Sequence, residues 1–355
     1  MSWVIFQNIL NNTVKLAYEL LPQKAEYLWR GMSVYAIDGS SYNLPATDEI
    51  RKEFDPESGL DHPGKGHYPK CLVSTAYDVF RRLPIARSIV KDNGSERDEA
   101  RSFIPFIPPG GVILFDRGYP GYGFIKDLIK TYSGYFVFRS PGSSTFPAVI
   151  SFLASNKDED IIWINPTHSY RVHLGVKLWR QAKPIKLRVI KLVSPDGTVS
   201  VLLTNLMNSE AFSRDNITNL YFQRWEVETH YRNEKTVLDI EKFHGKSSNS
   251  IRQELYAIMI VSIISRILME FAEQSHQYEK GFPQFKNAVM TIAYDAAALT
   301  PDDPVLAINI FKELLDEIAR VRYYQSPNKR PSQPRFTKRK INRWSVARKT
   351  KMLCH

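Results

Sequence analysis

YFQRWEVETHYRNEK, residues 221–235, places four residues of distinctive chemistry on one side of a single predicted helix. At about 100° per residue, Tyr221, Arg224, Glu228 and Lys235 fall within a wedge of roughly 60°. Arg232 and Trp225 flank this stripe. One carboxylate among cations and aromatic rings is not the composition of a core face, so we expect the stripe to border a cleft.

The two other sides of the same helix are assigned by hydrophobicity. A neighbouring apolar side should pack the helix onto the core, and it comprises Leu220, Val227, Tyr231 and Leu238. The opposite side is expected to face solvent, and it comprises Glu226, His230 and Asn233. The stripe would then lie at the edge of the buried face.

Two aspartates upstream follow apolar runs that read as strands. Asp38 lies in VYAIDGSSYNLP (34–45), and Asp116 lies in VILFDRGYPGYGFIKDL (112–128). Asp38, Asp116 and Glu228 would form a trio of hard oxygen ligands of the kind that holds two Mg²⁺ ions for phosphoryl transfer. Read singly, each aspartate is equally a turn former, and Glu228 is an i,i+4 partner of an arginine on either side.

The chain order of predicted elements is β-β-β-α-β-α-β up to residue 140, with Asp38 closing the first strand and Asp116 closing the fourth. The pattern then changes to short alternating runs, IIWIN, YRVHLGVKLW, IKLRVIKLV and VSVLLTNL, which predict a β-rich insertion. The helix bearing Glu228 is expected to begin near Ser213, and three more helices follow to Tyr324. The sequence therefore predicts an α/β fold.

These three segments, in this order, resemble the DDE transposases of bacterial insertion sequences. The spacing Tyr-x2-Arg-x3-Glu-x6-Lys is similar to that family's Tyr-Arg-Glu-Lys signature, and the segments around Asp38 and Asp116 resemble its two aspartate strands. The resemblance spans roughly residues 32 to 275. It implies a ribonuclease H-like mixed sheet flanked by helices, with the first and fourth strands adjacent and a β-rich insertion before the glutamate helix.

The expected organisation has six parts. They are a short helical N-terminal segment (1–31), the first part of the core (32–145), the insertion (146–210), the glutamate helix and its successor (211–275), a helical C-terminal region (276–324) and a basic flexible tail (325–355).

The resemblance implies a metal-dependent enzyme that hydrolyses phosphodiesters at transposon ends and transfers strands into target DNA. Asp38, Asp116 and Glu228 would be catalytic and would hold two Mg²⁺ or Mn²⁺ ions. The expected DNA contacts are Tyr221, Arg224, Trp225, Arg232 and Lys235, joined by Lys338, Arg339 and Lys340 in the tail. Trp225 would stack on an unpaired base, or alternatively pack under the insertion. Synapsis of two ends implies a dimer on DNA.

Composition and charge bear on the binding partner, the cellular compartment and the question of a membrane span. The formal net charge is +11, and residues 325–355 hold ten Lys and Arg with no acidic residue. This tail predicts phosphate contacts, or else it is a solvated arm without a dedicated partner. Two distant cysteines favour no disulfide framework and a reducing, cytoplasmic setting, nucleoid-associated when bound. The apolar window 255–271 contains two serines and Arg266, so we expect a buried helix and no membrane span.

Two alternatives stay open at this point. Only 37 residues precede Asp38, fewer than the resembling proteins usually have, so recognition of element ends is expected in the tail or the chain is a shortened copy. The rival functions are a catalytically idle DNA-binding relic of a transposase and another metal-dependent nuclease on the same fold.

Overall fold

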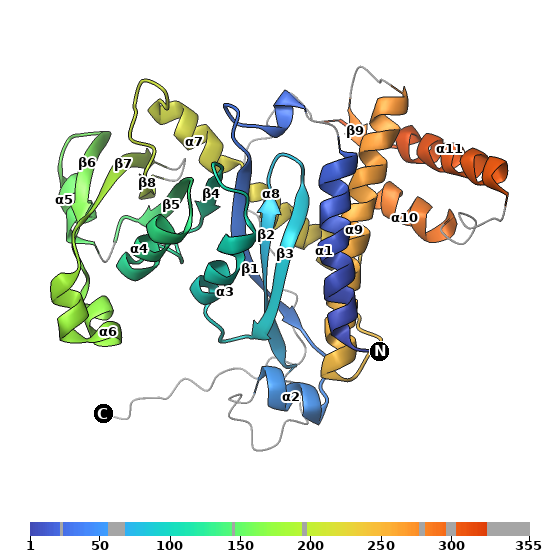
Figure 1. Cartoon of the computed structure of the whole chain (residues 1–355), viewed down its shortest axis with the longest axis horizontal. Helices are drawn as coiled ribbons and strands as arrows, with labels where there is room; N and C mark the ends of the chain where they lie inside the picture. The colour runs from blue at the N-terminus through green and yellow to red at the C-terminus, as the bar shows by residue number, and fades with distance from the viewer. Residues whose placement is uncertain are drawn as a thin grey trace.

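The computed structural model describes residues 1–21, 24–55, 68–143, 146–193, 197–276, 281–295 and 303–324. Within these residues one eight-stranded mixed sheet has the order β3-β2-β1-β4-β5-β8-β7-β6. Helices cover it, and a helical region lies beyond one edge (Figure 1). This architecture confirms the predicted α/β class with a ribonuclease H-like mixed sheet.

The strands of the large sheet are β1 (Val34–Asn43), β2 (Lys70–Asp78), β3 (Leu83–Lys91), β4 (Val112–Phe115), β5 (Tyr135–Pro141), β6 (Glu159–Ile164), β7 (Ile185–Val193) and β8 (Val199–Thr204). The helices are α1 (Trp3–Leu20), α2 (Asp48–Phe54), α3 (Glu96–Phe103), α4 (Tyr122–Thr131), α5 (Pro147–Ala154), α6 (His168–Gln181), α7 (Arg214–Phe222), α8 (Trp225–Thr236), α9 (Ser248–His276), α10 (Phe285–Asp295) and α11 (Pro304–Arg320). Two 3₁₀ turns, η1 (Ala25–Tyr27) and η2 (Ile104–Phe106), and a small ribbon of β9 (Phe282–Pro283) with β10 (Arg322–Tyr323) complete the described elements.

The register of β1 against β4 brings the two aspartates side by side. The strands pair in parallel, and their last matched residues are Ile37 and Phe115. Asp38 and Asp116 come next on each strand. The expectation that the first strand ends at Asp38 is wrong, because β1 continues to Asn43 through antiparallel pairing with β2.

The insertion continues the core sheet instead of forming a separate one. β8 pairs with β5, and β7 and β6 extend the sheet outward. Residues 170–179, predicted as a strand from their alternating pattern, lie in α6. Thr167 caps this helix by accepting a hydrogen bond from the Tyr170 amide, and the Tyr170 ring packs edge-on against Tyr122 of α4. Local capping and this tertiary contact outweigh the alternating pattern.

The apolar helix α9 is part of the protein core. It packs against α1 and β3 on one side and against α10 and α11 on the other (Figure 1). By length and composition alone it could cross a membrane. Ile251, Leu255, Met259 and Ile263 are buried in the main hydrophobic cluster, as expected for a buried helix.

Candidate active site

The predicted glutamate helix is two helices joined by a tight turn. α7 begins after Ser213, whose hydroxyl accepts a hydrogen bond from the Asn216 amide, and it ends at Phe222. The amides of Gln223 and Arg224 then donate to carbonyls three residues back, as in a 3₁₀ turn. This tightening changes the angle between residues before and after the turn, so the prediction of one continuous helix is wrong here.

Three carboxylates from distant parts of the chain surround the Arg224 guanidinium. Its Nη2 lies 2.6 Å from Glu228 Oε1 and 3.9 Å from Asp116 Oδ1, and its Nη1 lies 3.4 Å from Asp38 Oδ2. The structure therefore brings together the three acidic residues that the sequence singled out. Two come from neighbouring strands and one from α8, which packs against β1.

The site carries more negative than positive charge. Burial raises the pKa of Asp38 to about 7, against the opposing effect of Arg224, and the nearby Glu228 and Asp116 raise it further. The Arg224 side chain is 5% exposed, and its Nε has no hydrogen-bond partner among the described residues. One guanidinium thus faces three carboxylates and retains a free donor, an arrangement suited to a further cation and to an anionic oxygen.

Arg224 lies where the three carboxylates would otherwise approach one another. In the described part of the chain, no group of three or more His, Cys, Asp or Glu side chains stands close enough to hold a metal ion. The donors are nevertheless hard oxygens from rigid elements, which is the ligand type that Mg²⁺ and Mn²⁺ require. The donor set fits such ions, provided that the guanidinium withdraws from between the carboxylates.

Two further residues of the stripe lie along the same site. The Tyr221 hydroxyl donates to Asp116 Oδ1 at 3.4 Å. Lys235 Nζ donates to Ser40 Oγ at 2.8 Å and to the Ser41 carbonyl at 2.7 Å, close to Asp38 along β1. Burial lowers the pKa of Lys235. Tyr221, beside Asp116, and Lys235, beside Ser40 and Ser41 of β1, therefore lie at opposite ends of the stripe.

The other residues predicted to contact DNA are either exposed on α8 or lie outside the described residues. Trp225 is 60% exposed at the start of α8, so the alternative that it packs under the insertion does not apply, and Phe222 beside it is 48% exposed. Arg232 is exposed, and its Nη2 donates to Thr229 Oγ1. Lys338, Arg339 and Lys340 lie outside the described residues.

A buried polar network beneath α8 was not predicted. Glu234 and Arg87 have no exposed side-chain surface and form an ion pair of 2.5 Å. Tyr42 donates to Glu234 Oε2 at 2.6 Å, and His230 Nε2 lies 3.2 Å from Oε1. Burial by itself raises the pKa of Glu234, but Arg87, His230 and Tyr42 more than reverse this and hold it well below its usual range.

This network corrects the expectation that His230 faces solvent. His230 is 6% exposed and stacks on Tyr77 with ring centroids 5.2 Å apart. Glu234 requires partners from β1 and β3, and these turn α8 so that His230 points inward. The sequence held one signal, because Arg87 occupies an inward position of the alternating strand β3.

Tyr231 fixes α8 directly to the strand that carries Asp38. Its hydroxyl lies 2.7 Å from the Asp38 carbonyl and 3.1 Å from the Val73 carbonyl. Since Glu228 precedes Tyr231 by less than one helical turn, this contact sets the height of the Glu228 carboxylate above the sheet.

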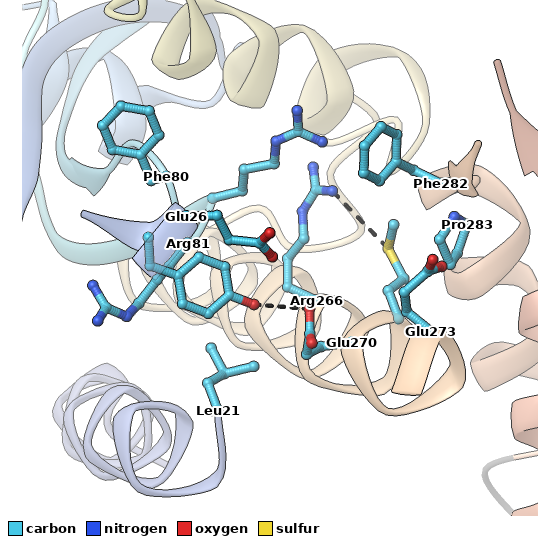
Figure 2. A pocket seen from close by; sticks show the side chains of 12 residues that line it. Leu21, Glu26, Phe80, Arg81, Arg266, Glu270, Glu273, Phe282 and Pro283 are labelled. Atoms are coloured by element: carbon cyan, nitrogen blue, oxygen red, sulfur yellow. Dashed lines mark hydrogen bonds between the residues drawn. The ribbon is translucent and has the colours of Figure 1, made fainter. Parts of the chain in front are cut away.

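A separate cavity of about 300 Å³ lies between the β2–β3 turn, η1, α9 and β9 (Figure 2). Its lining includes Phe80, Arg81, Arg266, Glu270 and Phe282, and none of the predicted site residues. Glu270 is engaged by Lys24 and Tyr27. The cavity therefore belongs to the contact between the core and the C-terminal helices.

Comparison with known proteins adds a family match. A model of the transposase DDE domain matches residues 29–264. The transposase InsG for insertion sequence element IS4 of Escherichia coli is 20% identical over 277 residues, which are 77% of this chain and 60% of InsG. The putative transposase y4zB of Sinorhizobium fredii is 28% identical over 195 residues, which are 55% of this chain and 52% of y4zB. The chain spans about half to three fifths of the length of these curated relatives.

One solved structure is similar in outline. It is the piggyBac transposase synaptic complex with hairpin DNA, with a TM-score of 0.45, 11% sequence identity, and coverage of 86% of this chain and 60% of that one.

Proposed function

The chain belongs to the DDE transposase family, and from this premise we propose that it is a DNA transposase that hydrolyses phosphodiesters at the ends of its element and joins them to target DNA. The observation that carries the proposal is the convergence of Asp38, Asp116 and Glu228 on Arg224. A DNA-binding relic would have no need to keep all three carboxylates, and a general nuclease would not account for the stripe of Tyr221, Arg224 and Lys235.

Asp38, Asp116 and Glu228 would hold Mg²⁺ or Mn²⁺, two ions in the proposed mechanism. When bound, such ions activate the attacking oxygen and stabilise the leaving oxygen at phosphorus. The carboxylates contribute by their rigid placement, two on adjacent strands and one on a helix anchored by Tyr231. No covalent enzyme intermediate is required.

Arg224 has two roles in this proposal. Without metal, its guanidinium lies among the carboxylates and offsets their mutual repulsion. With DNA present, it turns to a phosphate oxygen, for which its free Nε and planar donor fork are suited. Tyr221 and Lys235 would hold phosphates on either side, and Trp225 is exposed for stacking on an unpaired base.

The proposed partner is DNA, as element ends and as target, with Arg232 and the tail residues 338–340 adding phosphate contacts. Joining two ends requires two active sites, so we propose a dimer on DNA. We place the protein in the bacterial cytoplasm, bound to the nucleoid. The division of the chain into N-terminal segment, core, insertion and tail remains a proposal as well.

The test compares two substitutions on one helix. Glu228→Gln should abolish metal-dependent DNA cleavage while DNA binding persists. Glu226→Gln is the matched control, because Glu226 lies on α8 and pairs with Arg82 outside the carboxylate trio. If Glu228→Gln cleaves DNA with Mg²⁺ or Mn²⁺ as fast as Glu226→Gln and the unmodified protein do, the proposed catalytic role of Glu228 is ruled out.

A further inference from the structure

The insertion contains a long run without acidic residues. From residue 161 to residue 195 there is no Asp or Glu, while seven cations occur: Arg171, Lys177, Arg180, Lys183, Lys186, Arg188 and Lys191. This second concentration of positive charge is separate from the tail.

Five of these cations are exposed, and we call them together the basic face: Arg171, Lys177 and Arg180 of α6, Lys183 after α6, and Lys186 of β7. Within the described ranges, none of the five lies within 4.0 Å of a carboxylate, whereas Arg188 is buried and paired with Glu159. The basic face therefore carries uncompensated charge.

Two of these cations each lie over the face of an aromatic ring. Arg171 lies over the Trp179 ring at 5.5 Å, and Lys186 lies over the Trp163 ring at 5.9 Å. Trp163 is itself 56% exposed. Cations supported by rings lose less freedom when they bind, and their N–H groups remain available to an anionic partner.

The basic face is attached to the Asp116 side of the candidate active site. Tyr122 opens α4, the helix that follows Asp116, and its hydroxyl donates to the Lys183 carbonyl at 2.7 Å. Tyr170 of α6 packs against Tyr122 with ring centroids 4.8 Å apart, and Lys126 of α4 donates to the Tyr170 hydroxyl. Figure 1 shows α6 (bright green) next to α4.

We infer that the basic face binds the phosphate backbone of duplex DNA that extends from the candidate active site along the insertion. The inference rests on the proposed function and adds a contact surface to it. An anionic membrane is the competing partner, because Val172 is 72% exposed on α6. DNA is favoured because α6 is broken at Gly175 (φ 84°), and because α4 links α6 to the candidate active site.

The test is the salt dependence of DNA binding. A triple variant, Lys177→Gln, Arg180→Gln and Lys183→Gln, removes three cations of the basic face. A matched control, Lys15→Gln, Lys286→Gln and Lys312→Gln, removes three exposed cations from α1, α10 and α11. Binding of a fixed duplex is measured over a series of salt concentrations, together with metal-dependent cleavage at low salt and binding to vesicles of anionic lipid.

The log–log slope should fall by about 0.9 for each phosphate that is no longer bound, so by roughly 2 to 3 in the basic-face variant, and it should not change in the control. Cleavage by the basic-face variant should be retained at low salt. An equal slope in wild type and both variants overturns the inference and leaves the proposed function standing. Loss of vesicle binding with an unchanged DNA slope also overturns it, and an unmodified protein that neither binds nor cleaves DNA overturns both.

Discussion

Removal of the Glu234 carboxylate should destabilise the protein strongly, because it leaves the Arg87 guanidinium buried and uncompensated. Both side chains have zero exposure and are separated by 2.5 Å. Breaking a buried ion pair by removing one partner costs about 3–5 kcal/mol. We therefore expect Glu234→Ala to lower the free energy of unfolding by about that amount, measured by urea denaturation.

Two comparisons isolate the charge effect. The double variant Arg87→Met with Glu234→Leu removes both charges at similar volume, so it should be destabilised less than Glu234→Ala. Asp127→Asn removes a carboxylate that is 51% exposed and paired with Arg101, and its effect should stay below about 1 kcal/mol.

The pH dependence of the Glu234 effect has a defined sign. The folded-state pKa of Glu234 is depressed, so its contribution is fully present above the unfolded pKa of about 4.3 and is lost as pH falls through the folded value. The stability difference between wild type and Glu234→Gln should thus be constant near neutral pH and shrink only below about pH 4. A decrease of less than about 1 kcal/mol in Glu234→Ala, or a difference that shrinks already between about pH 8 and 6, would refute the assignment of a buried, ionised carboxylate.

Four further outcomes are expected. Tyr231→Phe removes the hydroxyl that bonds the Asp38 carbonyl and should cost about 1–2 kcal/mol in urea unfolding, with retained secondary structure by circular dichroism. Cys71 is buried and burial raises its pKa to about 12, so in a Cys354→Ser background iodoacetamide should label it only after denaturation, and rapid native labelling would contradict its burial. Trp225→Ala should leave stability within about 0.5 kcal/mol and weaken binding to DNA with an unpaired base by about 1–3 kcal/mol, compared with fully paired DNA as control. Deletion of residues 326–355 should flatten the salt dependence of DNA binding by about 0.9 for each phosphate that the tail neutralises, and an unchanged slope would show that the tail binds no phosphates.

Part of the layout of the candidate active site could be predicted from local sequence. Apolar runs before Asp38 and Asp116 predicted strands, and the spacing from Tyr221 to Lys235 predicted a helical stripe bordering a cleft. The strand predictions depend on neighbouring residues and the structure confirms them, whereas the turn at Gln223 and Arg224 divides the stripe between α7 and α8. The structure adds the register Ile37–Phe115, which turns two separate aspartates into neighbours.

Secondary-structure predictions from local sequence were wrong where contacts with residues distant in the chain determine the structure. Residues 170–179 alternate like a strand, yet the Thr167 cap and contact with α4 make them helical. The single helix expected from near Ser213 is interrupted at Gln223 and Arg224, where the Arg224 side chain turns toward Asp38 on β1 and Asp116 directly after β4.

The sequence by itself determined which residues we propose to carry the chemistry: three carboxylates and a Tyr-Arg-Lys stripe. Only the tertiary structure decided how α8 is rotated, and hence that Glu234 and His230 point inward. A fully buried carboxylate is tolerated only with a charge and hydrogen-bond partners, and here these come from Arg87 on β3 and Tyr42 on β1, far away in the chain. No helical periodicity contains that information, because it depends on which strands meet beneath the helix.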